Sequence, residues 1–206
     1  MLQKSMTEPI EAFNRAIFLR LNATPTTPHW LTEAGLLLAN YAIWIVPVTL
    51  ACMWLAAGSE RREIAVRASL VGFVALGINQ LIGMVWYHPR PFVTGLGHTL
   101  LAHAPDSSFP SDHVTLLSAV SFTFLYSGLR LPGLFILAVD IAVAWSRVFV
   151  GVHFPFDMVG AASVAWITYV LSSALWSSWG SAFTRACVVV YRKTLAWPID
   201  QGWLRP

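Results

Sequence analysis

Three groups of polar residues interrupt an otherwise apolar chain, and their side chains are of the kinds that act on phosphate esters. They are His88–Pro91, Phe109–His113, and Ser146–Arg147 followed by His153 and Asp157. Each group lies where a long apolar stretch begins or ends, which places it at a lipid–water boundary. Arginine binds phosphate oxygens, and histidine with a carboxylate can move protons or attack phosphorus. The chain therefore has what a phosphate-ester enzyme acting on a lipid would need.

The third group has the composition of an activated nucleophile. Pro155 suits the first turn of a helix, because its missing N–H costs nothing there. His153 would then lie just before this helix and Asp157 within its first turn. A carboxylate at that position can accept the N–H of the imidazole, which leaves the other ring nitrogen unprotonated as a base or nucleophile. Arg147 supplies a planar guanidinium for phosphate oxygens.

The second group is expected to form an anion site where another helix begins. Free backbone N–H groups at a helix N-terminus bind anions, and the hydroxyl of Ser111 adds a donor. His113 follows in the first turn and could protonate a leaving oxygen. Arg90 of the first group, held between two prolines, provides a second clamp for phosphate oxygens.

The composition of the chain indicates the elements that must position these groups. Of 206 residues, 56% are hydrophobic and 11% are charged, which is too apolar for an ordinary soluble domain. Stretches of about 20 apolar residues can cross a bilayer as helices. We predict membrane helices over residues 33–57, 64–87, 112–130, 132–150 and 156–177. The predicted fold class is an all-α integral membrane bundle of five transmembrane helices, with 33–177 as its core.

Both ends of the chain are expected to lie at the membrane surface. Residues 8–21, within the segment 1–31, have apolar side chains on one helical face and charged ones on the other, which is typical of an interfacial amphipathic helix. Residues 180–206 are basic and contain tryptophans, so we predict an amphipathic C-terminal tail. A sixth, weaker span around 182–191 is the alternative. Residues 1–206 would form a single membrane-embedded domain.

The order of the predicted spans puts all three polar groups on one side of the membrane. The second span ends near residue 88 and the third begins near 111, so both ends lie on one face of the membrane. The third and fourth spans cross the membrane twice, which returns the chain to the same face near residues 150 and 156. Most other basic residues, Arg61 and Arg130 among them, fall on the opposite side. Since cytoplasmic segments are rich in lysine and arginine, the groups are expected to face the non-cytoplasmic side.

Several other kinds of site are disfavoured. Cys52 and Cys187 lack metal-ligand spacing, no HExxH motif occurs, and the arginines would repel a cation, so neither a metal nor a cofactor is expected. The net charge of +3 forms no stripe of basic and aromatic residues, which argues against a nucleic-acid partner. Asp140, in the middle of the fourth span, is expected to be a protonated or hydrogen-bonded carboxyl that faces Asn79 or Gln80, outside the site.

Taken together, the three groups resemble the signature of the type 2 phosphatidic acid phosphatase superfamily, membrane lipid phosphatases related to vanadium haloperoxidases. The resemblance lies in Arg90-Pro91, in Pro110-Ser111-Asp112-His113, and in Ser146-Arg147 with His153 and Asp157. Further similarity, at Asn22–Pro25, Phe109–His113, Ala144–His153 and Pro198–Arg205, is to the bacitracin-resistance branch, the undecaprenyl-diphosphate phosphatases.

This resemblance implies a role for each matching residue. His153 would attack the terminal phosphorus and carry a phosphohistidine, Asp157 would orient it, and His113 would protonate the departing lipid phosphate. The phosphoryl oxygens would be held by Arg90, Ser111 and Arg147, without a metal.

Two positions depart from the family pattern. Asp112 stands where glycine is usual, and Gly83 stands where the family has a lysine. A phosphate contact is therefore missing or replaced, and His88 is the nearest candidate to replace it. We accordingly count His88 and Asp112 among the candidate phosphate-binding residues.

The resemblance implies hydrolysis of undecaprenyl diphosphate to undecaprenyl phosphate and inorganic phosphate, which recycles the cell-wall carrier lipid and confers bacitracin resistance. The protein would lie in the bacterial inner membrane, with its site on the periplasmic face and membrane lipids around it. Three alternatives stay open: transfer of the phosphate to lipid A, a phosphatase for phosphatidylglycerophosphate or phosphatidate, and an anion-binding transporter. Oligomeric state and tail preference are not determined by the sequence.

Overall fold

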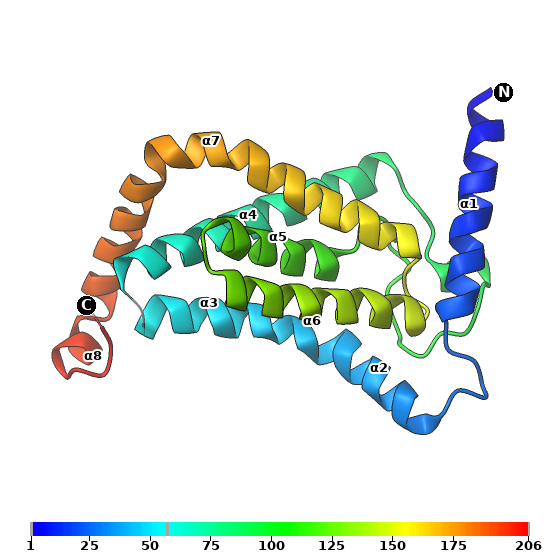
Figure 1. Ribbon diagram of the computed structural model, residues 1–206, viewed down its shortest axis with the longest axis horizontal. Coiled ribbons are helices and arrows are strands. Elements are labelled where there is room, and N and C mark those ends of the chain that lie inside the picture. The colour runs from blue at the N-terminus through cyan, green and yellow to red at the C-terminus, as the bar shows by residue number, and fades with distance from the viewer. Residues whose placement is uncertain (1, 57, 206) are drawn as a thin grey trace.

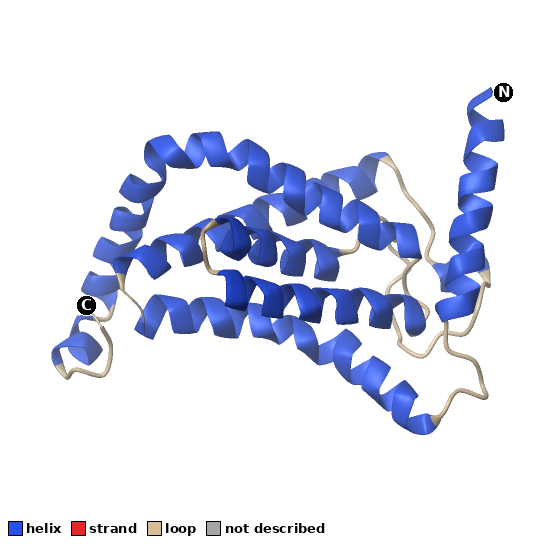
Figure 2. Cartoon of the chain, in the orientation of Figure 1, coloured by secondary structure: helices blue, strands red, loops and turns tan. Residues whose placement is uncertain are grey.

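The computed structural model describes residues 2–56 and 58–205, and every regular element within them is helical (Figure 2). The predicted all-α membrane bundle is therefore confirmed. The elements are α1 (Leu2–Leu21), α2 (His29–Tyr41), η1 (Ala42–Trp44), α3 (Ile45–Ala56), α4 (Ser59–Val85), η2 (Pro91–Thr94), α5 (Asp112–Tyr126), α6 (Arg130–Phe149), α7 (Pro155–Thr194) and α8 (Ala196–Asp200).

Among the described residues, four helical segments are long and apolar enough to cross a membrane. They are His29–Ala56, which comprises α2, η1 and α3, and the helices α4, α6 and α7. The predicted third span is the shorter helix α5, whose 15 residues extend about 22 Å at 1.5 Å per residue. A hydrocarbon core is about 30 Å thick, so α5 alone is too short to cross it.

Helix α5 is instead the centre of the bundle, where it packs against α4, α6 and α7. Its Leu117, Val120 and Phe124 are fully buried, and they form one core with residues of α6 such as Ile136 and Val143. A helix that is apolar on all sides is stable only when other helices surround it. The packing of α5 therefore fixes the position of its N-terminus, which carries the second polar group.

The N-terminal helix α1 lies crosswise to the bundle, at the end where α5 and α7 begin and α6 ends (Figure 1). This arrangement agrees with the predicted interfacial helix over residues 8–21. Contacts on one face attach α1 to the bundle: the ring of Phe18 packs against Phe154 at 5.3 Å between centroids, and Asn14 Oδ1 accepts the backbone N–H of Phe156 at 3.1 Å.

The C-terminal region differs from the prediction. Residues 180–194 are not an element separate from the last predicted span, because α7 continues without a break from Pro155 to Thr194 and bends near the far end of the bundle (Figure 1). Its end is anchored against α3 and α4: the ring of Tyr191 packs against Trp54, and Arg62 donates to the carbonyl of Arg205 at 2.7 Å. No proline or left-handed glycine ends the helix near residue 177, so apolar patterning placed its end too early.

Candidate active site

The three polar groups meet at one end of the bundle, around a cavity of about 370 Å³. The end of α4 and the segment after it supply Arg90, the start of α5 supplies His113, and the end of α6 supplies Arg147. The loop between α6 and α7 supplies His153. Four residues that are far apart in the sequence therefore line one cavity.

His153 is held by its Nδ1, which lies 3.2 Å from Asp157 Oδ2. The same carboxylate oxygen also accepts the backbone N–H of Phe154 at 2.8 Å and the hydroxyl of Ser108. Because an ionised carboxylate can only accept hydrogen bonds, Nδ1 of His153 carries the proton, and Nε2 is the unprotonated nitrogen that lies 3.1 Å from Nη1 of Arg90. The geometry therefore orients His153 as a nucleophile or base.

The environment of His153 also keeps its ring neutral. The pKa of His153 is lowered to about 4, mainly by burial and also by the positive charges of Arg147 and Arg90, while the hydrogen bond and charge of Asp157 oppose this lowering. A neutral imidazole is the form that can attack phosphorus. The ring is consequently neutral at every pH well above 4.

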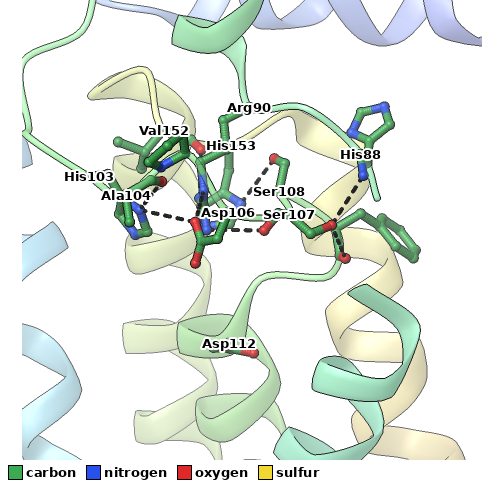
Figure 3. Close-up of polar contacts among 12 residues, drawn as sticks. His88, Arg90, His103, Ala104, Asp106, Ser107, Ser108, Asp112, Val152 and His153 are labelled. Carbon is green, nitrogen blue, oxygen red and sulfur yellow. Dashed lines mark hydrogen bonds and ion pairs between the residues drawn. The ribbon is translucent and has the colours of Figure 1, made fainter. Parts of the chain in front are cut away.

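Arg90 is almost fully buried, and its guanidinium already has several acceptors (Figure 3). Its Nε donates to Asp106 Oδ1 at 2.7 Å, and its Nη2 donates to the carbonyl of Ser107 at 3.2 Å. Its Nη1 donates to the carbonyl of Val152 at 2.9 Å and lies 3.1 Å from Nε2 of His153. Arg90 therefore touches the atom that would attack.

Arg147 is equally buried but has far fewer partners. Its Nη1 lies 3.4 Å from the carbonyl of Ala39, and its Nε is buried without a partner among the described residues. A buried guanidinium with unused donors is costly unless a ligand satisfies them. Since Arg147 lines the cavity, an anion there would supply the missing acceptors.

The start of α5 contributes the second group. Ser111 is the N-cap residue; it is fully buried, and its hydroxyl has no partner among the described residues. His113, in the first turn, lines the cavity together with the two arginines. Burial, together with the positive charges of Arg147 and Arg90, lowers the pKa of His113 to about 3, so an anionic substrate is what would favour protonation of His113.

Asp112 lies on the cavity wall, but its carboxylate is engaged by amides of α4. Asn79 Nδ2 donates to Oδ1 at 2.9 Å, and Gln80 Nε2 donates to Oδ2 at 3.1 Å. Gly83, one turn further along α4, also lines the cavity, and an added Cβ there would lie 3.3 Å from Cβ of Ser107. Amides and a carboxylate thus occupy this side of the cavity, and an ionised Asp112 would repel a phosphate rather than bind it.

The structure does not bring His88 to the cavity. Its ring is turned away from Arg90 and His153 (Figure 3). The ring packs against Phe154 at 5.6 Å between centroids, and its Nε2 lies 3.7 Å from Glu11 of α1. The phosphate contact expected of His88 is therefore not supported by this geometry, because the segment after α4 directs the ring toward α1.

The partner expected for Asp140 was also wrong. Its Oδ2 accepts the hydroxyl of Ser118 in α5, whereas Asn79 and Gln80 are bonded to Asp112. Asp140 lines a separate groove between α5, α6 and α7, so it stays outside the candidate site.

Two residues of the site were not foreseen. Ser108 bonds to Asp157, and Asp106 bonds to Arg90. Both lie in the loop before Phe109, where several polar residues precede the motif. Their position next to Pro110-Ser111 was the only available signal, and it did not specify a partner. Among the described residues no group of three or more His, Cys, Asp or Glu could hold a metal ion.

Comparison with known proteins identifies the family. Residues 64–181, more than half of the chain, match the PAP2 superfamily. The chain belongs to this superfamily. It is 31% identical over 196 residues to “Putative undecaprenyl-diphosphatase YbjG” of Escherichia coli (strain K12), which covers 95% of this chain and 99% of that protein. It is 36% identical over 152 residues to “Undecaprenyl-diphosphatase BcrC” of Bacillus subtilis (strain 168), covering 74% and 78%.

The fold is also similar to that of a solved PAP2 protein. A PAP2-type phosphatidylglycerolphosphate phosphatase from Bacillus subtilis superposes with a TM-score of 0.60 at 17% sequence identity, covering 82% of this chain and 87% of that one. At this identity the likeness concerns the fold alone. It supports a multi-pass membrane protein of the PAP2 kind.

Proposed function

We propose that this protein hydrolyses undecaprenyl diphosphate to undecaprenyl phosphate and inorganic phosphate. Two relatives that cover most of the chain are named for this activity. The observation that carries the proposal is Nε2 of His153, unprotonated and directed into a cavity that Arg90 and Arg147 also line. An oriented nucleophile beside two cations is the arrangement that phosphoryl transfer requires.

In the first step, Nε2 of His153 attacks the terminal phosphorus. The bond between this phosphorus and the bridging oxygen breaks, and undecaprenyl phosphate leaves. His113 donates a proton to the departing oxygen, while Arg147 and Arg90 stabilise the charge on the transferred group. Asp157 stabilises the positive charge that develops on the ring of His153, because it accepts the Nδ1 proton.

In the second step, water enters where the lipid phosphate has left. His113, now neutral, accepts a proton from this water, whose oxygen attacks the phosphohistidine. The bond between phosphorus and Nε2 breaks, and inorganic phosphate and free His153 result. The same residue therefore acts first as acid and then as base.

The lipid tail can remain in the membrane during both steps. The cavity is lined on its α4 side by Met84 and Tyr87, whose side chains are largely exposed at the surface of the bundle. A substrate could therefore place its diphosphate at the arginines while its tail lies along α4. We further propose that this end of the bundle faces the outside of the bacterial inner membrane, because the opposite end is richer in arginine.

The decisive test is phosphate release from undecaprenyl diphosphate by purified protein, with His153→Ala as the variant. We expect the variant to lose phosphate release while it remains folded. His29→Ala is the matched control, since His29 lies at the same end of the bundle but is 89% exposed. Turnover by His153→Ala at the wild-type rate would refute the proposal.

The same assay separates the alternative activities. Faster release from phosphatidylglycerophosphate or phosphatidate would show another lipid phosphatase, and phosphate appearing on added lipid A would show a transferase. Binding of anions without any phosphate release would favour a transporter.

A further inference from the structure

Asp106 is a carboxylate inside a cavity that is otherwise suited to anions. Its Oδ1 accepts the Nε–H of Arg90 at 2.7 Å, and it lies 3.5 Å from Nδ1 of His103 (Figure 3). The side chain is 60% exposed and lines the same cavity as Arg147 and His153. One of the two arginines proposed to bind phosphate, Arg90, is thus already paired with a carboxylate.

This contact limits what Arg90 can offer to a ligand. Two backbone carbonyls and Nε2 of His153 engage its Nη atoms, and the partly exposed carboxylate of Asp106 engages Nε. A phosphoryl oxygen and a carboxylate oxygen have the same preference for a guanidinium N–H. An anion that binds at Nε must therefore displace Asp106.

The other carboxylates near the cavity are not in this position. Asp112 is held by the amides of Asn79 and Gln80, and Asp157 is buried behind His153 with three donors on one oxygen. The carboxylate of Asp106 is bonded to a guanidinium instead, and its side chain is 60% exposed. The carboxylate of Asp106 can therefore turn away from Arg90 without moving from a buried position into solvent.

We propose that Asp106 competes with phosphate for Arg90 and thereby promotes release of the inorganic phosphate product. The inference rests on the proposed function, which supplies the anions concerned. Displacing Asp106 weakens the binding of every anion by a similar amount. A lipid diphosphate compensates through its second phosphate and its tail, whereas inorganic phosphate has only the contacts of a single phosphate. Asp106 thus lowers the affinity for inorganic phosphate and lets this product leave.

The test is the binding of inorganic phosphate to the full-length protein in detergent, measured by titration calorimetry at constant ionic strength. For Asp106→Asn we expect phosphate to bind about five-fold more tightly, a factor that corresponds to about 1 kcal/mol for one partly exposed ion pair. Asp112→Asn is the matched control, because it removes one negative charge from the same cavity without touching Arg90. Because Asp112 repels phosphate without a bond to Arg90, this control should raise phosphate affinity by less than two-fold, roughly the effect of a screened charge.

Three results would overturn the proposal. Unchanged binding in Asp106→Asn would show that no competition exists, and an equal effect in Asp112→Asn would show that only the total charge matters. Weaker phosphate binding together with a lower kcat would show that Asp106 merely positions Arg90. Asp106→Ser provides a second variant if the asparagine protein does not fold.

Phosphate binding at equilibrium involves no turnover, so this result does not depend on which lipid is hydrolysed. Failure of the proposed function would appear instead as absent phosphate release by the wild type. In an active protein, Asp106→Asn should in addition be inhibited by phosphate at about five-fold lower concentration, by the same ion-pair argument.

Discussion

Replacing Asp157 by asparagine tests the core of the mechanism. One oxygen of Asp157 accepts the N–H of Phe154, the Nδ1–H of His153 and the hydroxyl of Ser108. An amide keeps the size of the side chain but loses its charge, and its NH2 group can face Nδ1. His153 would then favour the tautomer that carries its proton on Nε2, the atom that must attack.

Loss of the correct tautomer in such a pair costs on the order of 10⁴ in kcat. The carboxylate of Asp157 accepts three hydrogen bonds, and bonds to a charged acceptor are stronger than bonds to a neutral one. The free energy of unfolding should therefore also fall, by about 2 kcal/mol. The assay is phosphate release from undecaprenyl diphosphate at saturating substrate, with thermal unfolding in detergent measured in parallel.

The matched control is Asp140→Asn, which makes the same change at another buried carboxyl that bonds a serine outside the site. We expect this control to keep most of its activity. A loss in Asp157→Asn of less than ten-fold, or an equal loss in the control, would refute the assigned role of Asp157.

Three further outcomes follow from the geometry. Arg147→Lys should lower kcat on the order of 10²-fold, because the ammonium cannot replace the unused donors of the guanidinium. The kcat/KM of the wild type should fall on the acid side only as pH approaches about 4, the pKa of His153, since protonation removes the attacking lone pair. Gly151→Ala should lower the unfolding free energy by at least about 1–2 kcal/mol in thermal melts, because Gly151 has φ of +84° and an added Cβ would lie 2.4 Å from the carbonyl of His98.

Much of the candidate site could be read from local chemistry. Pro155 places His153 and Asp157 at the start of a helix, and this spacing already specifies their hydrogen bond. The order of the apolar stretches required that this pair share a membrane face with Arg90 and His113. Each of these inferences depends only on neighbours in sequence or on the length of a membrane-crossing helix. A single amino-acid sequence was therefore sufficient to make them.

Other features depended on which way side chains turn in three dimensions. His88 is adjacent to the motif but faces α1, and Asp112 is fixed by amides one helix away. Asp140 bonds Ser118 rather than the predicted amides of α4. Hydropathy also could not show that α5 is too short to cross a membrane alone, or that α7 runs on to Thr194.

By itself, the sequence determined the class of fold, the family signature and the residues that can attack and protonate a phosphate ester. Only the tertiary structure decided that Ser108 supports Asp157 and that Asp106 occupies Arg90. The physical reason is that a hydrogen bond across a loop depends on the backbone path between its partners. Sequence spacing fixes such contacts within a helical turn, but not between a long loop and the segments that it covers.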